Sequence, residues 1–333
     1  MKVLFHAEQL NHRGTTNSIL DYAYFNQEIL GNESVIVYSQ ENPEGVDVGS
    51  VPSVVEKVKQ EFKTLTYEDN DHLNRLAADY DFFYSQRAGE KVDSHTQRKN
   101  AIIDTTRFGV HCVFQWYDPH GDVYAYISEW LAKEIGKNYS VDPHPKWVPY
   151  IVDMPEPNGH DVRSYFNIPK DKYVIGRHGG YNTLDVKQTI DAIVKVAETR
   201  EDIVFLFANT RPFIDHPRII FGPAFTGQQQ KANYIGACDA MIHGRFLGES
   251  FGLSVAEFLF QNKPVLAWNG GFDKNHIQTL APYDLLYEAD VDEIYNKIVG
   301  LRDRPPMNYK AAVEQYSPYN VMQQFKRVFL DGE

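Results

Sequence analysis

Two glutamates, Glu249 and Glu257, stand eight positions apart in the stretch HGRFLGESFGLSVAEF, residues 243–258. The apolar run Ala240–His243 predicts a strand before them, and the following residues predict a helix for which Ser250 is a suitable N-cap. Backbone N–H groups at a helix start lack partners and favour an anion such as phosphate. We therefore expect a phosphate-binding turn with one acid just outside the helix and the other about two turns inside it.

The chemistry of these residues indicates a ligand with three different parts. Carboxylates only accept hydrogen bonds, so two of them suit a hydroxyl-rich ligand such as a ribose joined to a sugar. Arg177 and Arg245 are nearby cations for a diphosphate. Arg177 belongs to the stretch GRHGGYNTLDVK, residues 176–187, which follows a predicted strand and whose glycines allow close approach of the backbone to a ligand. A nucleotide sugar combines the ribose, the diphosphate and the sugar.

The acid pair also carries a family resemblance. The segment from Glu249 to Glu257, ESFGLSVAE, followed by NKPV at residues 262–265, resembles the acid pair of the retaining GT-B glycosyltransferases, the group 1 enzymes that include glycogen synthases and phosphatidylinositol mannosyltransferases. In that family the first acid contacts the donor sugar and the second binds the nucleotide ribose. The resemblance therefore implies these roles for Glu249 and Glu257.

Further site residues follow from the same resemblance. It implies catalytic roles for His111, Glu249 and Arg177. It implies donor contacts at a wider set of residues in the strand-to-helix turns: Gly14, Thr15, Gly179, Gly180, Lys187, His243, Arg245, Gly248, Ser250, Phe251, Gly252 and Glu257.

Two features depart from the family pattern. Relatives usually carry a lysine about five residues after the arginine, whereas Lys187 follows Arg177 by ten positions. The alternative for Lys187 is an ordinary lysine on a helix surface. Relatives also often have Pro-Ser where this chain has His243 and Gly244, so Arg245 is expected to share the phosphate contacts.

Two histidines in the stretch FGVHCVFQWYDPHGD, residues 108–122, compete for a place in the ligand cleft. His111 lies near the end of a predicted strand, and a neutral imidazole there can bind a sugar hydroxyl. The resemblance favours His111 over His120, which lies in a predicted turn. No zinc, nucleophile-elbow or Walker pattern occurs, and the resemblance implies no metal and no cofactor besides the donor.

Composition limits the partners and the compartment. The formal net charge of -12 argues against nucleic-acid binding, which relies on clustered cations. Two cysteines, Cys112 and Cys238, form no disulfide framework. Neither a signal peptide nor an apolar stretch of about 18 residues is recognisable, which predicts a cytoplasmic protein and leaves contact with a membrane surface open. The sequence leaves the oligomeric state open.

The chain of 333 residues exceeds one usual core, and apolar runs alternate with helical segments, which predicts two doubly wound, Rossmann-like α/β domains facing across a cleft. A proline-rich segment, residues 142–159, is the predicted linker. The domains are expected at 1–152 and 153–315, with a final helix in 316–333 that in this fold commonly returns to the first domain. Expected strands cover 3–6, 34–39, 81–86, 110–114, 124–128, 173–177, 203–209, 218–221, 240–243, 264–267 and 285–287. Expected helices cover 15–30, 70–80, 128–137, 187–199, 228–237, 251–261 and 291–302.

These patterns predict a retaining, metal-independent glycosyltransferase. It would move a sugar from a UDP- or GDP-sugar to a hydroxyl of a glycan, a lipid or another acceptor. The alternatives are another GT-B enzyme, an epimerase or a phosphorylase, and a non-catalytic protein that binds nucleotide sugars. A nicotinamide oxidoreductase is disfavoured because no Gly-x-Gly-x-x-Gly follows the first strand.

Overall fold

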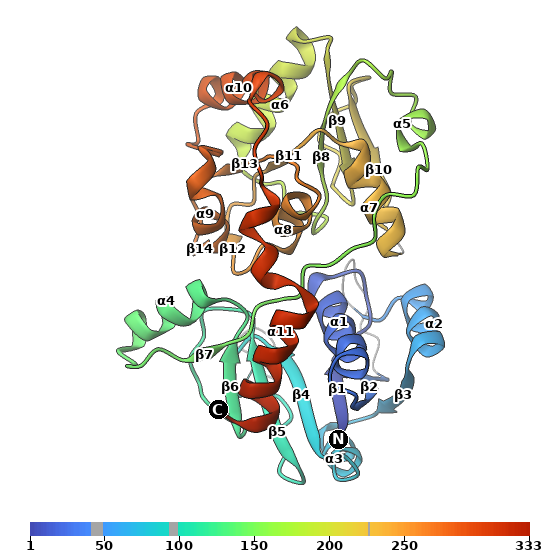
Figure 1. The fold of residues 1–333 in the computed structure, drawn as a ribbon, viewed down its shortest axis with the longest axis vertical. Coiled ribbons are helices and arrows are strands. Elements are labelled where there is room, and N and C mark those ends of the chain that lie inside the picture. The colour runs from blue at the N-terminus through green and yellow to red at the C-terminus, as the bar shows by residue number, and fades with distance from the viewer. Residues whose placement is uncertain (41–48, 93–98, 226) are drawn as a thin grey trace. The chain divides into compact units, whose positions relative to one another are not determined.

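The computed structural model describes residues 1–40, 49–92, 99–225 and 227–333. The chain forms two compact units (Figure 1). Unit 1 comprises Met1–Ile151 together with Tyr316–Glu333, and unit 2 comprises Val152–Gln315.

Unit 1 is built on a seven-stranded sheet whose pairs are all parallel, in the order β3-β2-β1-β4-β5-β6-β7. Its inner strands are almost wholly buried, as parallel strands covered by helices on both faces must be. The strands are β1 (Lys2–Ala7), β2 (Glu33–Ser39), β3 (Lys63–Tyr67), β4 (Phe82–Arg87), β5 (Arg107–Cys112), β6 (Val123–Tyr126) and β7 (Lys146–Trp147). The helices are α1 (Gly14–Glu28), α2 (Pro52–Glu61), α3 (Asn70–Ala77) and α4 (Glu129–Tyr139).

Side-chain caps fix two of these helices. Asp69 accepts a hydrogen bond from the His72 amide at 2.7 Å and begins α3. Ser128 accepts one from the Leu131 amide at 3.2 Å and begins α4. Both serve backbone donors that would otherwise lack partners at a helix start.

The C-terminal segment packs into the core of unit 1. It consists of α11 (Pro318–Phe325) and a π-helical continuation, η5 (Lys326–Asp331). Phe325 is fully buried, with its ring stacked on Tyr22 of α1 at 5.1 Å between centroids. The Arg107 guanidinium donates to the carbonyl of Leu330 at 2.7 Å, so both packing and hydrogen bonds hold the segment.

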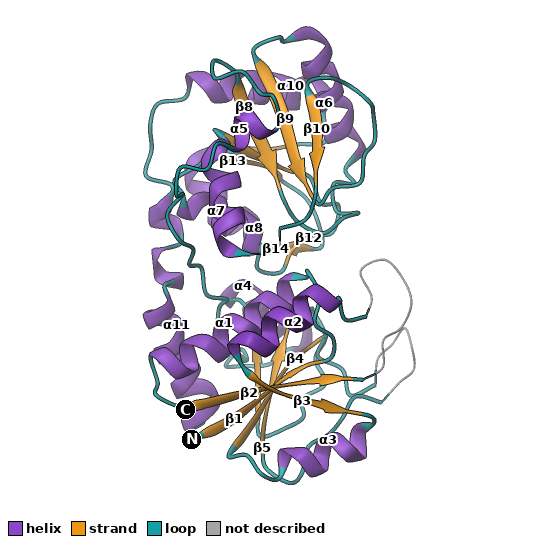
Figure 2. Cartoon of the chain, turned by 90° about the vertical axis from the view of Figure 1, so that its right-hand side faces the viewer, coloured by secondary structure: helices purple, strands orange, loops and turns teal. Residues whose placement is uncertain are grey.

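Unit 2 repeats the doubly wound plan on a six-stranded parallel sheet, in the order β10-β9-β8-β11-β13-β15. The helices α6 and α10 pack against each other (Figure 2). Helix α8 contacts β11 and β13. The strands are β8 (Tyr173–Arg177), β9 (Ile203–Ala208), β10 (Ile219–Gly222), β11 (Ala240–His243), β13 (Val265–Trp268) and β15 (Leu286–Tyr287), with a separate short pair of β12 (Gly248–Glu249) and β14 (Asp273–Lys274). The helices are α5 (Val162–Tyr165), α6 (Lys187–Thr199), α7 (Gln228–Ala237), α8 (Leu253–Phe260), α9 (Asn275–Leu280) and α10 (Val291–Gly300), followed or joined by 3-10 turns at Ala281–Tyr283, Leu301–Asp303, Lys310–Ala312 and Glu314–Tyr316.

The strand orders place a topological switch point in each sheet. It lies between β1 and β4 in unit 1 and between β8 and β11 in unit 2. Ligands of open α/β sheets bind beyond the carboxyl ends of the strands at such points. In unit 2 these strands end at Arg177 and His243. The loops that follow these two residues are therefore the expected position of a ligand.

Candidate functional site

Arg177 is a buried cation at the end of β8, only 3% exposed. Its guanidinium donates to the hydroxyls of Thr210 and Thr183, both at 2.6 Å. Burial lowers the pKa of Arg177 to about 10, so the side chain still carries its charge at neutral pH. None of the ion pairs among the described residues includes Arg177, although the charges of Glu249 and Asp185 act on it.

The glycines after β8 wrap closely around this arginine. A Cβ at Gly179 would lie 3.3 Å from Nη2 of Arg177, and one at Gly180 would lie 3.0 Å from Cγ2 of Thr183. Larger residues at either position would crowd the arginine or its hydroxyl partner. The loop therefore shapes the surroundings of Arg177.

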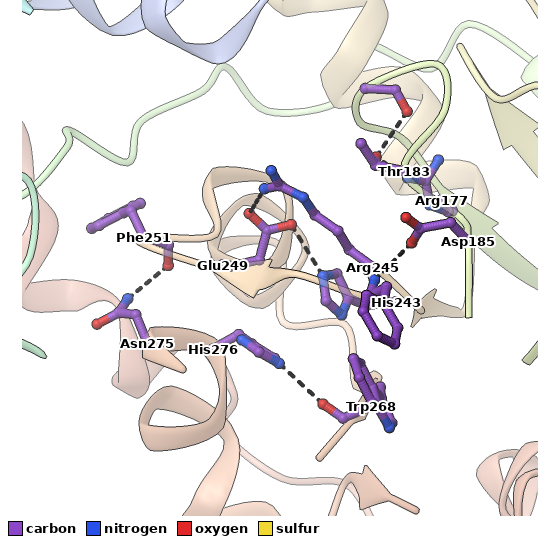
Figure 3. A network of polar contacts seen from close by, with 12 residues as sticks. Arg177, Thr183, Asp185, His243, Arg245, Glu249, Phe251, Trp268, Asn275 and His276 are labelled. Atoms are coloured by element: carbon purple, nitrogen blue, oxygen red, sulfur yellow. Dashed lines mark hydrogen bonds and ion pairs between the residues drawn. The ribbon is translucent and has the colours of Figure 1, made fainter. Parts of the chain in front are cut away.

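Glu249 lies in β12, where both of its carboxylate oxygens are bound (Figure 3). Nη1 of Arg245 donates to one oxygen at 3.0 Å, and Nε2 of His243 lies 3.1 Å from the other. Burial by itself raises the pKa of Glu249, but the hydrogen bond from His243 and the charge of Arg245 outweigh it and hold the pKa at about 2. Glu249 is therefore a fixed anion.

The turn around Glu249 requires glycine. Gly248 has a φ of 73°, and a Cβ there would lie 1.9 Å from the carbonyl oxygen of Asp273 in β14. Gly252 has a φ of 87° and occupies the N-cap position of α8. The two left-handed residues let the chain leave β12 and enter the helix within a few residues.

The prediction that Ser250 caps this helix is wrong. The helix begins at Leu253, its N-cap is Gly252, and no side chain caps it. The pairing of β12 with β14 places Gly248 and Glu249 in a strand pair, and the helix follows only after Gly252. Phe251, another predicted donor contact, has a buried ring, and its carbonyl accepts a hydrogen bond from Asn275 at 2.6 Å (Figure 3).

Glu257 lies inside α8 and is also a buried, charged acid. Lys231 of α7 donates to one carboxylate oxygen, and Nε2 of His178 lies 3.0 Å from the other, although the ring direction leaves that nitrogen without a well-directed hydrogen bond. Burial raises the pKa of Glu257, but Lys231 and His178 outweigh it and lower the pKa to about 2. Glu257 is therefore ionised, with Lys231 as its cationic partner.

A pair of buried histidines lies behind Glu249. The rings of His243 and His276 are 4.9 Å apart, and Nε2 of His276 lies 3.0 Å from the carbonyl oxygen of Trp268 (Figure 3). Burial lowers the pKa of His276 to about 3, so its ring is neutral. Among the described residues, Nδ1 of each histidine has no hydrogen-bond partner.

Unit 1 holds the remaining predicted residues: Gly14, Thr15, His111 and the alternative His120. Gly14 and Thr15 begin α1, and a Cβ at Gly14 would meet nothing within 4 Å. His120 is buried in its turn, where Nδ1 lies 2.7 Å from the carbonyl oxygen of Asp118 and burial lowers the pKa of the ring.

The surroundings of His111 do not support a ligand-binding role. The ring is fully buried among aromatic side chains, with Nδ1 2.6 Å from the Tyr84 hydroxyl and Nε2 2.9 Å from the carbonyl oxygen of Val148. Both nitrogens are thus occupied within unit 1. The side chain of His111 therefore belongs to the core of unit 1.

Lys187 has the structure of a surface residue. Its side chain is 79% exposed and pairs with Asp191 one helical turn further on, at 2.5 Å. A second buried cation of this unit, Lys231, and the histidines His178 and His276 were not identified from the sequence. A signal existed for Lys231, because it precedes the apolar residues Tyr234 and Ile235 by three and four positions and so shares their buried helix face.

No group of three or more His, Cys, Asp or Glu side chains in the described part of the chain is arranged to hold a metal ion. No helix in the described ranges is long and apolar enough to cross a bilayer.

The chain is similar to known proteins in its fold but not in its sequence. No protein-family model matches the sequence, and no curated protein is similar to it at the sequence level. Among solved structures, HepE of Anabaena in complex with UDP-glucose is similar over 100% of both chains, with a TM-score of 0.76 and 13% identity. Sucrose-phosphate synthase of Thermosynechococcus elongatus is similar over the same share of both chains, with a TM-score of 0.68 and 13% identity.

The chain has the GT-B fold. A glycosyltransferase of Rickettsia africae adds a third similar structure, with a TM-score of 0.65 and 12% identity over 99% of this chain and 96% of that one. The two parallel sheets and these full-length similarities confirm the fold class and the resemblance predicted from the acid pair. At such low identity the likeness extends to the fold alone.

Proposed function

We propose that this GT-B protein is a retaining glycosyltransferase that uses a nucleoside diphosphate sugar, with a UDP-sugar as the first donor to test. The observation that carries the proposal is the arrangement at the switch point of unit 2. There the buried cation Arg177 is free of ion pairs among the described residues, and the ionised acids Glu249 and Glu257 flank the start of α8. HepE, which is similar in fold, has been solved with UDP-glucose and with UDP and glucose.

Each residue has a role that its chemistry suits. Glu249 would accept hydrogen bonds from hydroxyls of the donor sugar, and Glu257 from those of the ribose. Arg177, Arg245 and the uncapped amides at the start of α8 would bind the diphosphate. Lys187 and His111 have no part in this assignment, because one lies on the surface and the other in the core.

The transfer step needs charge stabilisation at the leaving group. As the bond from the anomeric carbon to the β-phosphate oxygen breaks, its electron pair stays on that oxygen. The acceptor hydroxyl oxygen bonds to the anomeric carbon on the same face, and its proton passes to the leaving diphosphate. Arg177 and Arg245 would stabilise the growing negative charge, which is the main catalytic task of such a site.

The test is transfer by Glu249→Gln and Glu249→Ala variants after a donor screen of UDP-, GDP- and ADP-sugars. We expect a loss of about 100-fold or more in kcat/KM with an unchanged circular dichroism spectrum, because the charged acceptor is lost from the transition state. Lys187→Ala is the control and should transfer at the wild-type rate. Wild-type kinetics in Glu249→Ala would refute the assignment, and tight nucleotide binding without transfer to any acceptor would favour a binding protein.

A further inference from the structure

Among the lysines that the structure describes, Lys231 is the only buried one. Its side chain is 9% exposed, on the inner face of α7. Lysines rarely lie this deep unless a partner holds the charge. The partner here is Glu257, and that acid already has a second neighbour in His178.

The position of Lys231 connects it with Arg177. Tyr234, one turn further along α7, accepts a hydrogen bond from the Arg177 amide at 3.0 Å and contacts the Arg177 carbonyl oxygen at 2.8 Å. His178, which contacts Glu257, directly follows Arg177 in the chain. The helix face that carries Lys231 therefore contacts the end of β8 through Tyr234. Lys231 itself is linked to the residue after β8, His178, through Glu257.

The cations of this cluster are Arg177, Lys231 and Arg245. Glu257 and Glu249 are ionised and contact Lys231 and Arg245, and the charges of Glu249 and Asp185 act on Arg177. A lysine ammonium has three donors, so Lys231 has further N–H groups to offer a phosphate oxygen while it keeps Glu257.

We propose that Lys231 is the second diphosphate-binding cation of the donor site, in place of the lysine expected shortly after Arg177. The inference rests on the proposed function, since it names a further residue of that site. On ligand binding, the ribose hydroxyls would share Glu257, and the ammonium would contact the phosphate nearest to it. Lys231 would thereby link ribose recognition to the stabilisation of the leaving diphosphate.

The binding of nucleosides and nucleoside diphosphates distinguishes a phosphate-binding role of Lys231 from a purely structural one. Dissociation constants for UDP, UMP and uridine would be measured by calorimetry for the wild type, Lys231→Met and the surface control Lys187→Met. We expect Lys231→Met to weaken UDP binding by about 10- to 100-fold and uridine binding by less than about threefold. Lys187→Met should bind all three ligands like the wild type.

A second pair of variants removes the effect of an unpaired acid. Lys231→Met leaves Glu257 without its main cation, so the same ligands would also be measured with Glu257→Gln and with the double variant Lys231→Met/Glu257→Gln. When the double variant is compared with Glu257→Gln, the loss of UDP affinity should still exceed the loss of uridine affinity. Equal losses for UDP and uridine, or none for either, would overturn the role of Lys231. A wild type that binds none of UDP, GDP and ADP would instead refute the proposed function.

Discussion

The buried His111 makes the stability of unit 1 sensitive to mild acid. Burial lowers the pKa of this imidazole to about 4, whereas a histidine in the unfolded chain titrates near 6.5. The carbonyl oxygen of Val148 accepts only, so Nε2 carries the proton and Nδ1 accepts from the Tyr84 hydroxyl. Protonation of Nδ1 would break that hydrogen bond and place a charge in an aromatic core.

The sign and size of the effect follow from these two pKa values. The stabilisation from the neutral ring is complete above 6.5 and is lost as the pH falls from there towards about 4, because only the unfolded state takes up the proton. Between pH 7 and pH 5, the free energy of unfolding should fall by about 2 kcal/mol from this histidine alone. Below about pH 4 both states are protonated, and this contribution changes no further.

The measurement is urea unfolding at pH 7, 6 and 5, together with a proton NMR titration of the histidine rings. His111→Gln keeps an acceptor for Tyr84 and a donor for Val148, and it should reduce the pH dependence by about 2 kcal/mol. His144→Gln, which changes an exposed histidine of the same unit, should leave the dependence unchanged. A ring of His111 that titrates near 6.5 in the folded protein would refute the reasoning.

Two packing predictions test the cores of the units separately. Phe325→Ala removes a fully buried ring that stacks on Tyr22 and should lower the free energy of unfolding of unit 1 by about 3–5 kcal/mol, measured by urea unfolding; an unchanged midpoint would contradict the packing of α11. Gly176→Ala places a Cβ 2.4 Å from Sγ of Cys238 and should cost unit 2 about 1–3 kcal/mol, whereas Gly14→Ala, with nothing within 4 Å, should cost unit 1 no packing energy. Equal stability of both glycine variants would count against the contact at Cys238.

The parallel strands and their helices could be predicted from the sequence because strands that are buried on both faces consist of continuous apolar runs. The predicted bounds of β8, β11, α6 and α7 match those of the structure. The missed strand β3 is an edge strand with half-exposed side chains, so its sequence, KTLTY, contains no such run. Its preceding helix, α2, was missed with it.

The site was readable only where its parts are close in the sequence. The acid pair and its glycines lie within one turn and one helix. The helical spacing of Lys231 indicates its burial, but its contact with Glu257, 26 residues away on another helix, has no local signal in the sequence. The expected cap at Ser250 is wrong because α8 begins only after Gly252, following the tertiary pairing of β12 with β14.

The contacts of the two acids bear on how transfer would respond to pH. Glu249 and Glu257 both have a pKa of about 2, and both oxygens of Glu249 are already held by Arg245 and His243 before any ligand binds. Neither acid changes its charge between pH 5 and pH 8. In the proposed transfer, the donor sugar would therefore share a carboxylate that is already bound to its cationic partners. Any change in the rate of transfer across that range would have to arise from groups other than these two acids.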